Sequence, residues 1–292
     1  MSVCVPVYNG ERVLGHALDS ILAQTYRDYE LIISDNASTD STAEICGGYA
    51  ARDPRIRYFR NETNIGANPN FNRLVRLARR PYFKLANADD VCHPDLLARC
   101  ISVLDRQPEV VLCYARTRLI DAQGNSLGDY QDDLDLRWPS AAARFRAVMD
   151  RIGLVNVLQG VIRTDVLKAT SLLGSYPGAD ILLVGELALR GEFYEVPERL
   201  FLRRMHATAA SSLKRPDEQQ AFVDPAVRDT YSLRASRKHL GYFCALLRTP
   251  LSLRERLTLS FWIARSVIWH RRSLGRELLQ LVRSCFGKAP QP

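Results

Sequence analysis

The sequence predicts an α/β fold in which a mostly parallel sheet carries helices on both faces and is followed by a C-terminal helical extension. Residues 1–120 alternate short apolar runs with segments whose apolar residues recur at helical spacing. This alternation is typical of parallel strands joined by helices. Beyond Lys214 only helical patterns follow. The composition, with 47% hydrophobic and 25% charged residues, is that of a globular protein.

Five short apolar runs in the first half predict strands, and the first of them is suited to a strand that is buried on both faces. They cover residues 2–8, 29–35, 56–61, 82–90 and 110–120. Amphipathic patterns or cap-type residues place the intervening helices at 14–22, 38–52, 68–80 and 94–108. Pro94 opens the last of these helices, and the turn "DAQGN" closes the fifth strand.

From residue 139 to about 205 the alternation loosens. We expect a helix near 141–151, a strand in "VLQGVIR" at 157–163, and a loop leading into a helix within 175–191. A strand interrupted by a proline is expected at 193–206. The sequence therefore predicts a second half that is less regular than the first.

The net charge of +8 is unevenly distributed along the chain. Residues 1–227 hold 27 Lys and Arg against 29 Asp and Glu, whereas residues 228–292 hold 13 against 3. Any attraction to an anionic partner is therefore expected from the C-terminal segment. That segment contains no signature of a nucleic-acid-binding motif, so we expect no nucleic-acid partner.

The seven cysteines form no CxxC pair and no cluster with zinc-like spacing. We interpret them as buried thiols of a protein in the reducing cytoplasm. The opening "MSVCVPVYNG" has no basic segment and enters a strand pattern at once, so a signal peptide is not expected.

Two adjacent carboxylates, Asp89 and Asp90, end the predicted strand in "YFKLANADD". Ligands of open α/β sheets bind outside the carboxyl ends of the strands, so Asp35 of "LIISDNASTD" is expected in the same crevice. Adjacent carboxylates repel unless a cation lies beside them, and Mg²⁺ or Mn²⁺ held by one or two carboxylates keeps positions for phosphate oxygens. The alternative is that Asp90 caps the next helix, Asp89 is solvated, and Asp35 opens an Asx-turn.

The stretch "CVPVYNGERVLGHALDSILAQTYRDYELIISDNASTDST", followed by "NIGANPNFN" and "LANADD", resembles the inverting glycosyltransferases of family 2, which have the GT-A fold. The resemblance covers residues 2 to about 212. It implies a nucleotide-binding half at 1–115, an acceptor-side half at 116–212 and a separate basic extension at 213–292. The implied activity is inverting transfer of a sugar from a UDP-, GDP- or dTDP-sugar to a hydroxyl of a carbohydrate or lipid-linked acceptor. Cell-surface polysaccharide or glycolipid synthesis is the implied setting.

The resemblance also assigns roles to individual residues. Pro6 and Tyr8 would line the base pocket, Asp35 would accept a hydrogen bond from the base, and Gly66 would let the backbone approach the nucleotide; Gly66 is otherwise a simple turn glycine. The full set of implied donor contacts is Pro6, Tyr8, Asn9, Glu11, Asp35, Gly66, Asn68 and Asp89.

A divalent metal, Mn²⁺ or Mg²⁺, is implied on Asp89, with Asp90 and His206 as further ligands. Asn87 stands where the family has the first acid of its Asp-x-Asp motif. In "LRRMHATAASS", Arg203 or Arg204 would contact the diphosphate.

Inverting transfer also needs a base for the acceptor hydroxyl, and a carboxylate within hydrogen-bond reach is sufficient. Asp180 in "SYPGADILLVGELALRG" matches the acid that the family places at the start of its acceptor-side helix. Glu186 on the same predicted helix is the fallback base. The alternative for Asp180 is an ordinary helix N-cap.

Two other functions compete with sugar transfer. A nucleotidyltransferase would use a similar sheet and carboxylate pair, but it normally has a glycine-rich phosphate loop after the first strand, where this chain has "VYNGERVLG". A non-catalytic protein that binds nucleotide sugars or an anionic surface is the second alternative.

The tail segment "LSLRERLTLSFWIARSVIWHRRSLGRELLQLVRS" predicts contact with an anionic membrane surface. Its apolar residues Leu257, Phe261, Trp262, Ile268 and Trp269 are interspersed with Arg265, Arg271, Arg272 and Arg276. The most apolar stretch, residues 257–270, contains Arg265 and is shorter than the roughly 20 residues that span a bilayer. A helix lying in the membrane interface is therefore expected. The alternative is that these apolar residues pack on the catalytic domain.

Overall fold

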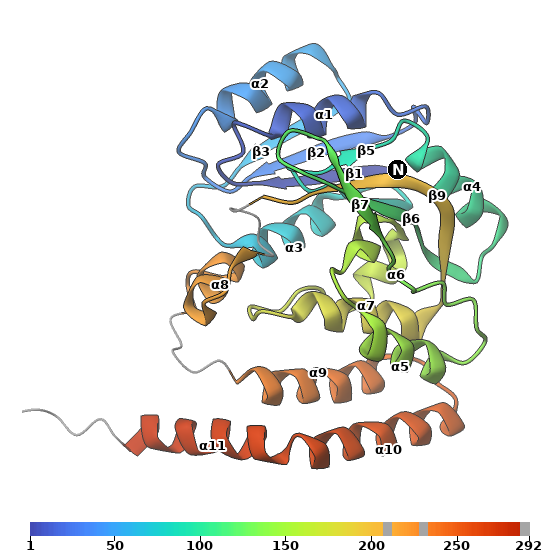
Figure 1. Cartoon of the computed structure of the whole chain (residues 1–292), viewed down its shortest axis with the longest axis vertical. Coiled ribbons are helices and arrows are strands. Elements are labelled where there is room, and N and C mark those ends of the chain that lie inside the picture. The colour runs from blue at the N-terminus through green and yellow to red at the C-terminus, as the bar shows by residue number, and fades with distance from the viewer. Residues whose placement is uncertain (207–211, 228–232, 287–292) are drawn as a thin grey trace, which may run out of the picture.

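A computed structural model describes residues 1–206, 212–227 and 233–286 of the chain (Figure 1). One nine-stranded sheet forms the centre, in the order β3-β2-β1-β4-β8-β6-β9-β5 with β7 paired to β6. The strands are β1 (Ser2–Val7), β2 (Glu30–Asp35), β3 (Ile56–Arg60), β4 (Tyr82–Leu85), β5 (Val91–Cys92), β6 (Val110–Ile120), β7 (Ser126–Tyr130), β8 (Val161–Arg163) and β9 (Glu192–Arg204). The helices of the first two-thirds are α1 (Leu14–Leu22), α2 (Thr42–Arg52), α3 (Ala67–Leu77), α4 (Leu96–Arg106), α5 (Ala141–Arg151), α6 (Thr164–Lys168) and α7 (Ala179–Arg190). Helices α8 (Pro216–Val223), α9 (Arg234–Arg248), α10 (Leu253–Trp269) and α11 (Arg271–Phe286) follow.

The sheet is parallel in its first half and mixed in its second. Strands β3, β2, β1 and β4 all run in one direction, and the register pairs Val7 with Asp35 and Asp35 with Arg60. Strand β8 is antiparallel to β4 and β6, β9 is parallel to β6, and β5 and β7 are antiparallel edge pairings. The carboxyl ends of β1, β2 and β3 therefore open at one edge, where the predicted site begins.

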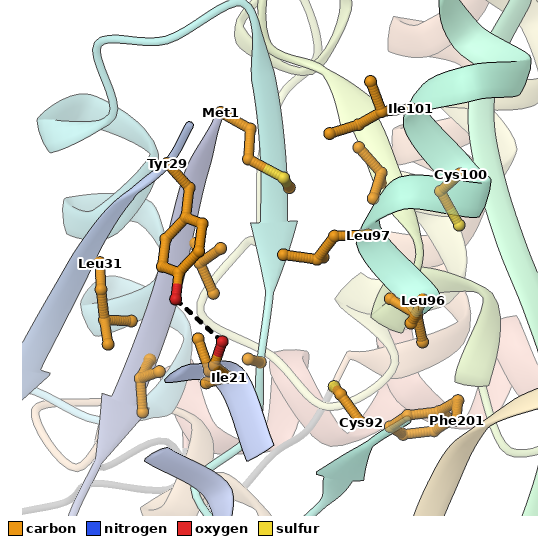
Figure 2. Packing of buried hydrophobic residues seen from close by; sticks show 14 of the residues in the cluster. Met1, Ile21, Tyr29, Leu31, Cys92, Leu96, Leu97, Cys100, Ile101 and Phe201 are labelled. Atoms are coloured by element: carbon orange, nitrogen blue, oxygen red, sulfur yellow. Dashed lines mark hydrogen bonds between the residues drawn. The ribbon is translucent and has the colours of Figure 1, made fainter. Parts of the chain in front are cut away.

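Helices cover both faces of the sheet, as predicted (Figure 1). One hydrophobic core lies between the sheet and α1 and α4, and Figure 2 shows part of it, including the hydrogen bond from the Tyr29 hydroxyl to the Ile21 carbonyl at 2.9 Å. A second core lies between the other face and α3, α5 and α7. Five cysteines, at positions 4, 46, 92, 100 and 113, are buried free thiols and Cys244 is a partly exposed one, while the Cys285 side chain lies outside the described residues.

The prediction of a strand over residues 157–163 is wrong in its first half. A 3₁₀ helix, η1 (Asn156–Gln159), comes first, and the strand is limited to β8. Val155, with a left-handed φ of 59°, precedes this 3₁₀ helix. Gly160 lies so close to β6 that a Cβ there would be 2.5 Å from the Cys113 carbonyl oxygen. The strand predicted at 82–90 ends at Leu85, and the short elements β5, β7 and α6 were not predicted.

A third hydrophobic core joins the C-terminal helices to α5 and α7. Phe145 of α5 contacts Tyr242 of α9 and Trp262 of α10 edge to face, with ring centroids 5.4 and 5.8 Å apart. Trp262 was predicted to face a membrane, and this packing contradicts that prediction. The division of the chain at residue 212 stays a prediction. Among the described residues, no helix combines the length and the apolar character needed to cross a bilayer.

Candidate active site

The loops after β1 and β2 are bound to each other at the carboxyl edge of the sheet. Asn9, at a left-handed φ of 51°, donates its backbone N–H to the Ser38 hydroxyl at 2.9 Å and accepts from the Thr39 N–H at 2.8 Å. The Glu11 carboxylate accepts from the Ser41 N–H at 3.2 Å. Asn9 and Glu11, predicted as donor contacts, therefore hold the rim of the crevice in shape. Tyr8 lies beside them with 48% of its surface exposed.

Asp35 is completely buried at the end of β2. Its carboxylate accepts from the Ser38 N–H and from the Tyr58 hydroxyl, both at 2.9 Å, and lies 3.6 Å from the guanidinium of Arg60. The bond to Ser38 goes to the N–H three residues on, whereas the Asx-turn of the alternative interpretation would bond the N–H two residues on. A nucleotide base would reach this carboxylate only after Arg60 or Tyr58 moved, because those two side chains cover it.

A network of buried amides beside Asp35 was missed by the sequence reasoning. The Asn61 amide donates to the side-chain oxygens of Asn36 at 2.8 Å and Asn70 at 3.2 Å. Asn70 in turn accepts from the Ser34 hydroxyl at 2.6 Å. The signal was present in the polar "RNETN" that follows the third strand, since polar residues at a strand's carboxyl end are frequent site residues.

Gly66 and Asn68 are committed to contacts within the protein. Gly66 has a φ of 87°, and a Cβ there would lie 2.4 Å from the Val223 carbonyl oxygen, so a glycine is needed where the end of α8 crosses. Asn68 donates to the Gly174 carbonyl at 2.7 Å. Their predicted nucleotide contacts stay predictions, and the packing explains both residue types without a ligand.

Asp89 and His206 are 117 residues apart in the sequence and lie side by side in the structure. The Asp89 carboxylate lies 3.0 Å from Nε2 of His206, and the two side chains are 28% and 20% exposed. Asp89 belongs to the turn after β4, and His206 follows directly after β9. The pair therefore combines a carboxylate and an imidazole that solvent or a ligand can reach.

Asp90, in contrast, points into the protein. One carboxylate oxygen accepts from the Arg204 N–H at 2.9 Å, and the other accepts from the Asn87 amide at 2.9 Å. Burial and the neighbouring charge of Asp89 raise the pKa of Asp90 to about 7. Asp90 is not a helix cap either, because α4 begins after Asp95.

Arg204 is buried, and its side chain stabilises the turn that contains Asp89 and Asp90. Its guanidinium donates to the backbone carbonyls of Asp89 at 2.9 Å, Asp121 at 3.1 Å and Ala122 at 2.9 Å. The guanidinium is thus used within the protein, and the predicted contact of Arg204 with a diphosphate stays a prediction. Its contribution is to hold Asp89 in place.

A metal ion fits this crevice only as a centre with few protein ligands. Within the described parts of the chain, no three His, Cys, Asp or Glu side chains gather as a ligand cluster. Asp89 and His206 offer one oxygen and one nitrogen within 3.0 Å of each other. Mg²⁺ and the similar Mn²⁺ commonly take one or two carboxylates and fill their other positions with water and substrate phosphates, so the donor set fits.

Asp180 lies in the first turn of α7, the helix that was predicted to face the acceptor. The helix begins after Gly178, whose φ is 89°, so Asp180 is not the N-cap. Its carboxylate accepts from the Ile181 N–H at 3.0 Å. Burial raises the pKa of Asp180, and the positive charge of Arg203 opposes part of that rise.

The positive charge of Arg203 also opposes part of the rise that burial and Asp89 cause in the pKa of Asp90. It donates to the Asn156 side chain at 2.6 Å and to the Leu154 carbonyl at 2.5 Å. Arg203, like Arg204, donates to groups within the protein, and its predicted contact with the diphosphate stays a prediction.

Glu186, the fallback base, is fully buried on the other side of α7. Its carboxylate accepts from the Ser171 hydroxyl at 2.6 Å, from the Ser171 N–H at 2.9 Å and from the Arg248 guanidinium of α9 at 3.2 Å. An acceptor hydroxyl would have to displace these donors to reach it. Glu186 therefore links the acceptor-side helix to the C-terminal helices.

We expect Glu186→Gln to lower the free energy of unfolding by about 1–3 kcal/mol while leaving turnover within a few-fold of wild type. The NH₂ group that replaces one carboxylate oxygen cannot accept a hydrogen bond from Ser171 or Arg248. Urea unfolding and initial transfer rates measure the two effects. If Glu186→Gln abolished turnover without loss of stability, the base would have to be reassigned to Glu186.

The family profile described as glycosyl transferase family 2 matches residues 2–149, which is half of the chain. This chain belongs to glycosyltransferase family 2. An uncharacterized protein of Mycobacterium tuberculosis is 32% identical over 212 residues, which cover 71% of this glycosyltransferase and 59% of the relative. The chain thus spans about three-fifths of the length of that relative. Chondroitin synthase of Escherichia coli is 31% identical over 129 residues, 44% of this chain and 19% of the synthase.

Solved structures confirm the GT-A fold predicted for this glycosyltransferase. Staphylococcus aureus TarS 1–349 in complex with UDP-GlcNAc superposes with a TM-score of 0.66 at 17% identity, covering 91% of this chain and 72% of TarS. The mannosyltransferase PcManGT of Pyrobaculum calidifontis, in complex with GDP-Man and Mn²⁺, superposes with a TM-score of 0.53 at 16% identity, covering 99% and 87%. At these identities the similarity concerns the fold.

Proposed function

We propose that this glycosyltransferase transfers a sugar, with inversion, from a nucleotide-diphosphate donor to an acceptor hydroxyl. The observation that carries the proposal is the exposed pair of Asp89 and His206, held at the carboxyl edge of the sheet by the buried contacts of Asp90 and Arg204. An ordered carboxylate and imidazole at this edge suit a divalent cation that binds the diphosphate of a donor, which a purely structural turn would not require. The complexes of TarS with UDP-GlcNAc and of PcManGT with GDP-Man support a nucleotide sugar as donor.

Asp89 and His206 would hold Mn²⁺ or Mg²⁺, with Asp90 supporting the turn. When bound, the ion supplies positive charge that offsets the charge developing on the departing diphosphate. The Mn²⁺ in PcManGT supports this choice of cofactor. The guanidinium of Arg203 would add a second positive charge on the acceptor side of the diphosphate.

Asp180 would take the proton of the acceptor hydroxyl. Its carboxylate lies at the start of α7, and the raised pKa that burial gives it makes it a stronger base than an exposed aspartate. Attack by that hydroxyl on the face of the anomeric carbon opposite the diphosphate forms one bond as the other breaks, and the configuration is inverted. Tyr8 and Pro6 would line the base pocket.

The acceptor belongs, in this proposal, to cell-surface polysaccharide or glycolipid synthesis. The similarity to chondroitin synthase, which is named for a polysaccharide product, supports this class. A saccharide hydroxyl is also the kind of nucleophile that needs a carboxylate base such as Asp180.

Thermal unfolding with nucleotides tests the donor site. We expect UDP or GDP together with Mn²⁺ to raise the melting temperature of the full chain, because a ligand that binds only the folded state stabilises it. At a hundred times its Kd, the nucleotide should add about 2.7 kcal/mol to the free energy of unfolding. The nucleotide with EDTA is the control. If none of UDP, GDP and dTDP shifts the melting temperature, the proposal is contradicted. If one of them does, a panel of nucleotide sugars would identify the donor.

A further inference from the structure

Helix α10 has apolar residues on two opposite sides. Leu259 and Ile263 face inward and belong to the third core, together with the partly buried Trp262. The outward residues Leu253, Leu257, Phe261, Ala264 and Ile268 are exposed and recur every three or four residues, so they form one stripe along the helix. Leu257 and Leu259 are about 200° apart around the helix axis, which places the two stripes on opposite sides. A surface helix that only covers a core has no need of the second stripe.

The outer stripe continues along α11. Backbone hydrogen bonds from His270 to Ser266 and from Leu274 to His270 carry the helical pattern through the junction, and Figure 1 shows α10 and α11 as one long rod at the edge of the molecule. The exposed Leu278, Leu279 and Val282 follow Ile268 by ten, eleven and fourteen residues, which returns them to the same face. We call the exposed apolar residues 253, 257, 261, 264, 268, 278, 279 and 282 the outer stripe; it is roughly 45 Å long.

Positive charge lines the outer stripe, and negative charge is turned away from it. Five exposed arginines flank the stripe, namely Arg254, Arg265, Arg271, Arg272 and Arg276. Residues 253–286 contain only two acids, Glu255 and Glu277. Glu255 accepts from the Ala141 N–H at 2.7 Å, and Glu277 accepts from the Ala235 and Ser236 N–H groups at 2.9 Å, so both carboxylates cap neighbouring helices.

We propose that the outer stripe of α10 and α11 docks on the surface of an anionic lipid bilayer, with the stripe in the interface and the flanking arginines on lipid headgroups. An interfacial helix combines apolar residues on one side with basic residues beside them, which is the arrangement found here. This inference goes beyond sugar transfer and does not depend on it.

The charges also argue against a second copy of the chain as the occupant. A symmetric dimer would pair this face with itself and bring the arginines of both chains together without an outward carboxylate to offset them. An anionic bilayer offers an apolar layer and negative charge over the whole length of the stripe. Because the inner side of α10 shares the third core with α5, the whole chain can dock without unfolding.

Vesicle sedimentation with the full 292-residue chain tests the proposal. We expect binding to vesicles of phosphatidylcholine with phosphatidylglycerol, little binding to phosphatidylcholine alone, and loss of binding at high salt. Replacing Arg265, Arg271 and Arg272 together by glutamine should lower the partition coefficient about a hundredfold, at roughly fivefold for each arginine. Replacing Leu257, Phe261 and Ile268 together by serine should lower it by roughly tenfold or more.

Matched controls make the same kinds of substitution elsewhere on the surface. Leu127→Ser in the exposed β6–β7 hairpin and Arg52→Gln on α2 should leave binding unchanged. Binding that is equal on neutral and anionic vesicles, or that survives both triple variants, overturns the proposal. A dimer in sedimentation velocity that the serine variant abolishes, without vesicle binding by wild type, also overturns it and assigns the stripe to a second copy. None of these measurements requires sugar transfer, so the proposal can fail while the proposed function stands.

Discussion

Asp180→Asn is expected to lower turnover by roughly two to four orders of magnitude while the affinity for the donor nucleotide stays unchanged. Asparagine has the same shape and can still accept the hydrogen bond from the Ile181 N–H, so the first turn of α7 should be preserved. What is lost is the ability to take a proton from the acceptor hydroxyl. Single-turnover transfer rates and nucleotide-induced melting shifts separate these two quantities.

The pH dependence of transfer provides a second measurement of Asp180. Burial raises the pKa of this carboxyl above its ordinary value near 3.9, and a base works only when it is deprotonated. The kcat/KM of the wild type should therefore fall as the pH is lowered through the raised pKa, and recover above it. This acid limb should be missing from the residual activity of Asp180→Asn.

Glu186→Gln is the matched control, because it makes the same acid-to-amide change on the same helix at a carboxylate that Ser171 and Arg248 already occupy. Near-normal turnover of Asp180→Asn, or an unchanged acid limb, would remove Asp180 from the role of base.

The sequence predicted the parallel half of the fold well because each of its elements has a strong local pattern. The apolar runs that became β1 and β2 are buried on both faces, so their hydrophobicity is continuous, whereas β3 is a partly exposed strand at the edge of the sheet. The short elements were not predicted because their local sequence patterns are weak. Strand β5 has only two residues and is defined by its pairing with β9. The 3₁₀ helix η1 depends on the left-handed backbone of Val155, which the local sequence does not predict.

The candidate site was predicted in its types of residue but not in their orientation. The sequence could place Asp89, Asp90, Arg203 and Arg204 at strand ends, yet adjacent residues of a strand or turn point in opposite directions. Which of each pair faces the crevice depends on distant partners: Asp90 is turned inward by the Arg204 N–H and Asn87, and Arg204 by the carbonyls of Asp121 and Ala122. Trp262 was misplaced for a similar reason, because both sides of α10 are apolar in the sequence.

Asp89→Asn is expected to reduce transfer by at least roughly 10³-fold and to abolish the Mn²⁺-dependent part of the nucleotide melting shift. The carboxylate carries the only negative charge that the exposed pair offers to a cation, whereas an amide is a weak, neutral ligand. The fold should survive, because the side chain is partly exposed and asparagine can still accept a hydrogen bond from Nε2 of His206. Melting curves with and without Mn²⁺, each with saturating nucleotide, measure the effect.

Asp90→Asn makes the same change one residue further on and distinguishes ligation of the metal from stabilisation of the turn. One oxygen of Asp90 accepts from the Arg204 N–H and the other from the Asn87 amide, so an asparagine must place its own NH₂ against one of these donors. We expect this variant to lose about 1–3 kcal/mol of stability and to weaken metal-dependent binding less than Asp89→Asn does. The reverse ranking would move the metal to Asp90. Equal, near-normal activity of both variants would mean that the two carboxylates serve only the structure of the turn after β4.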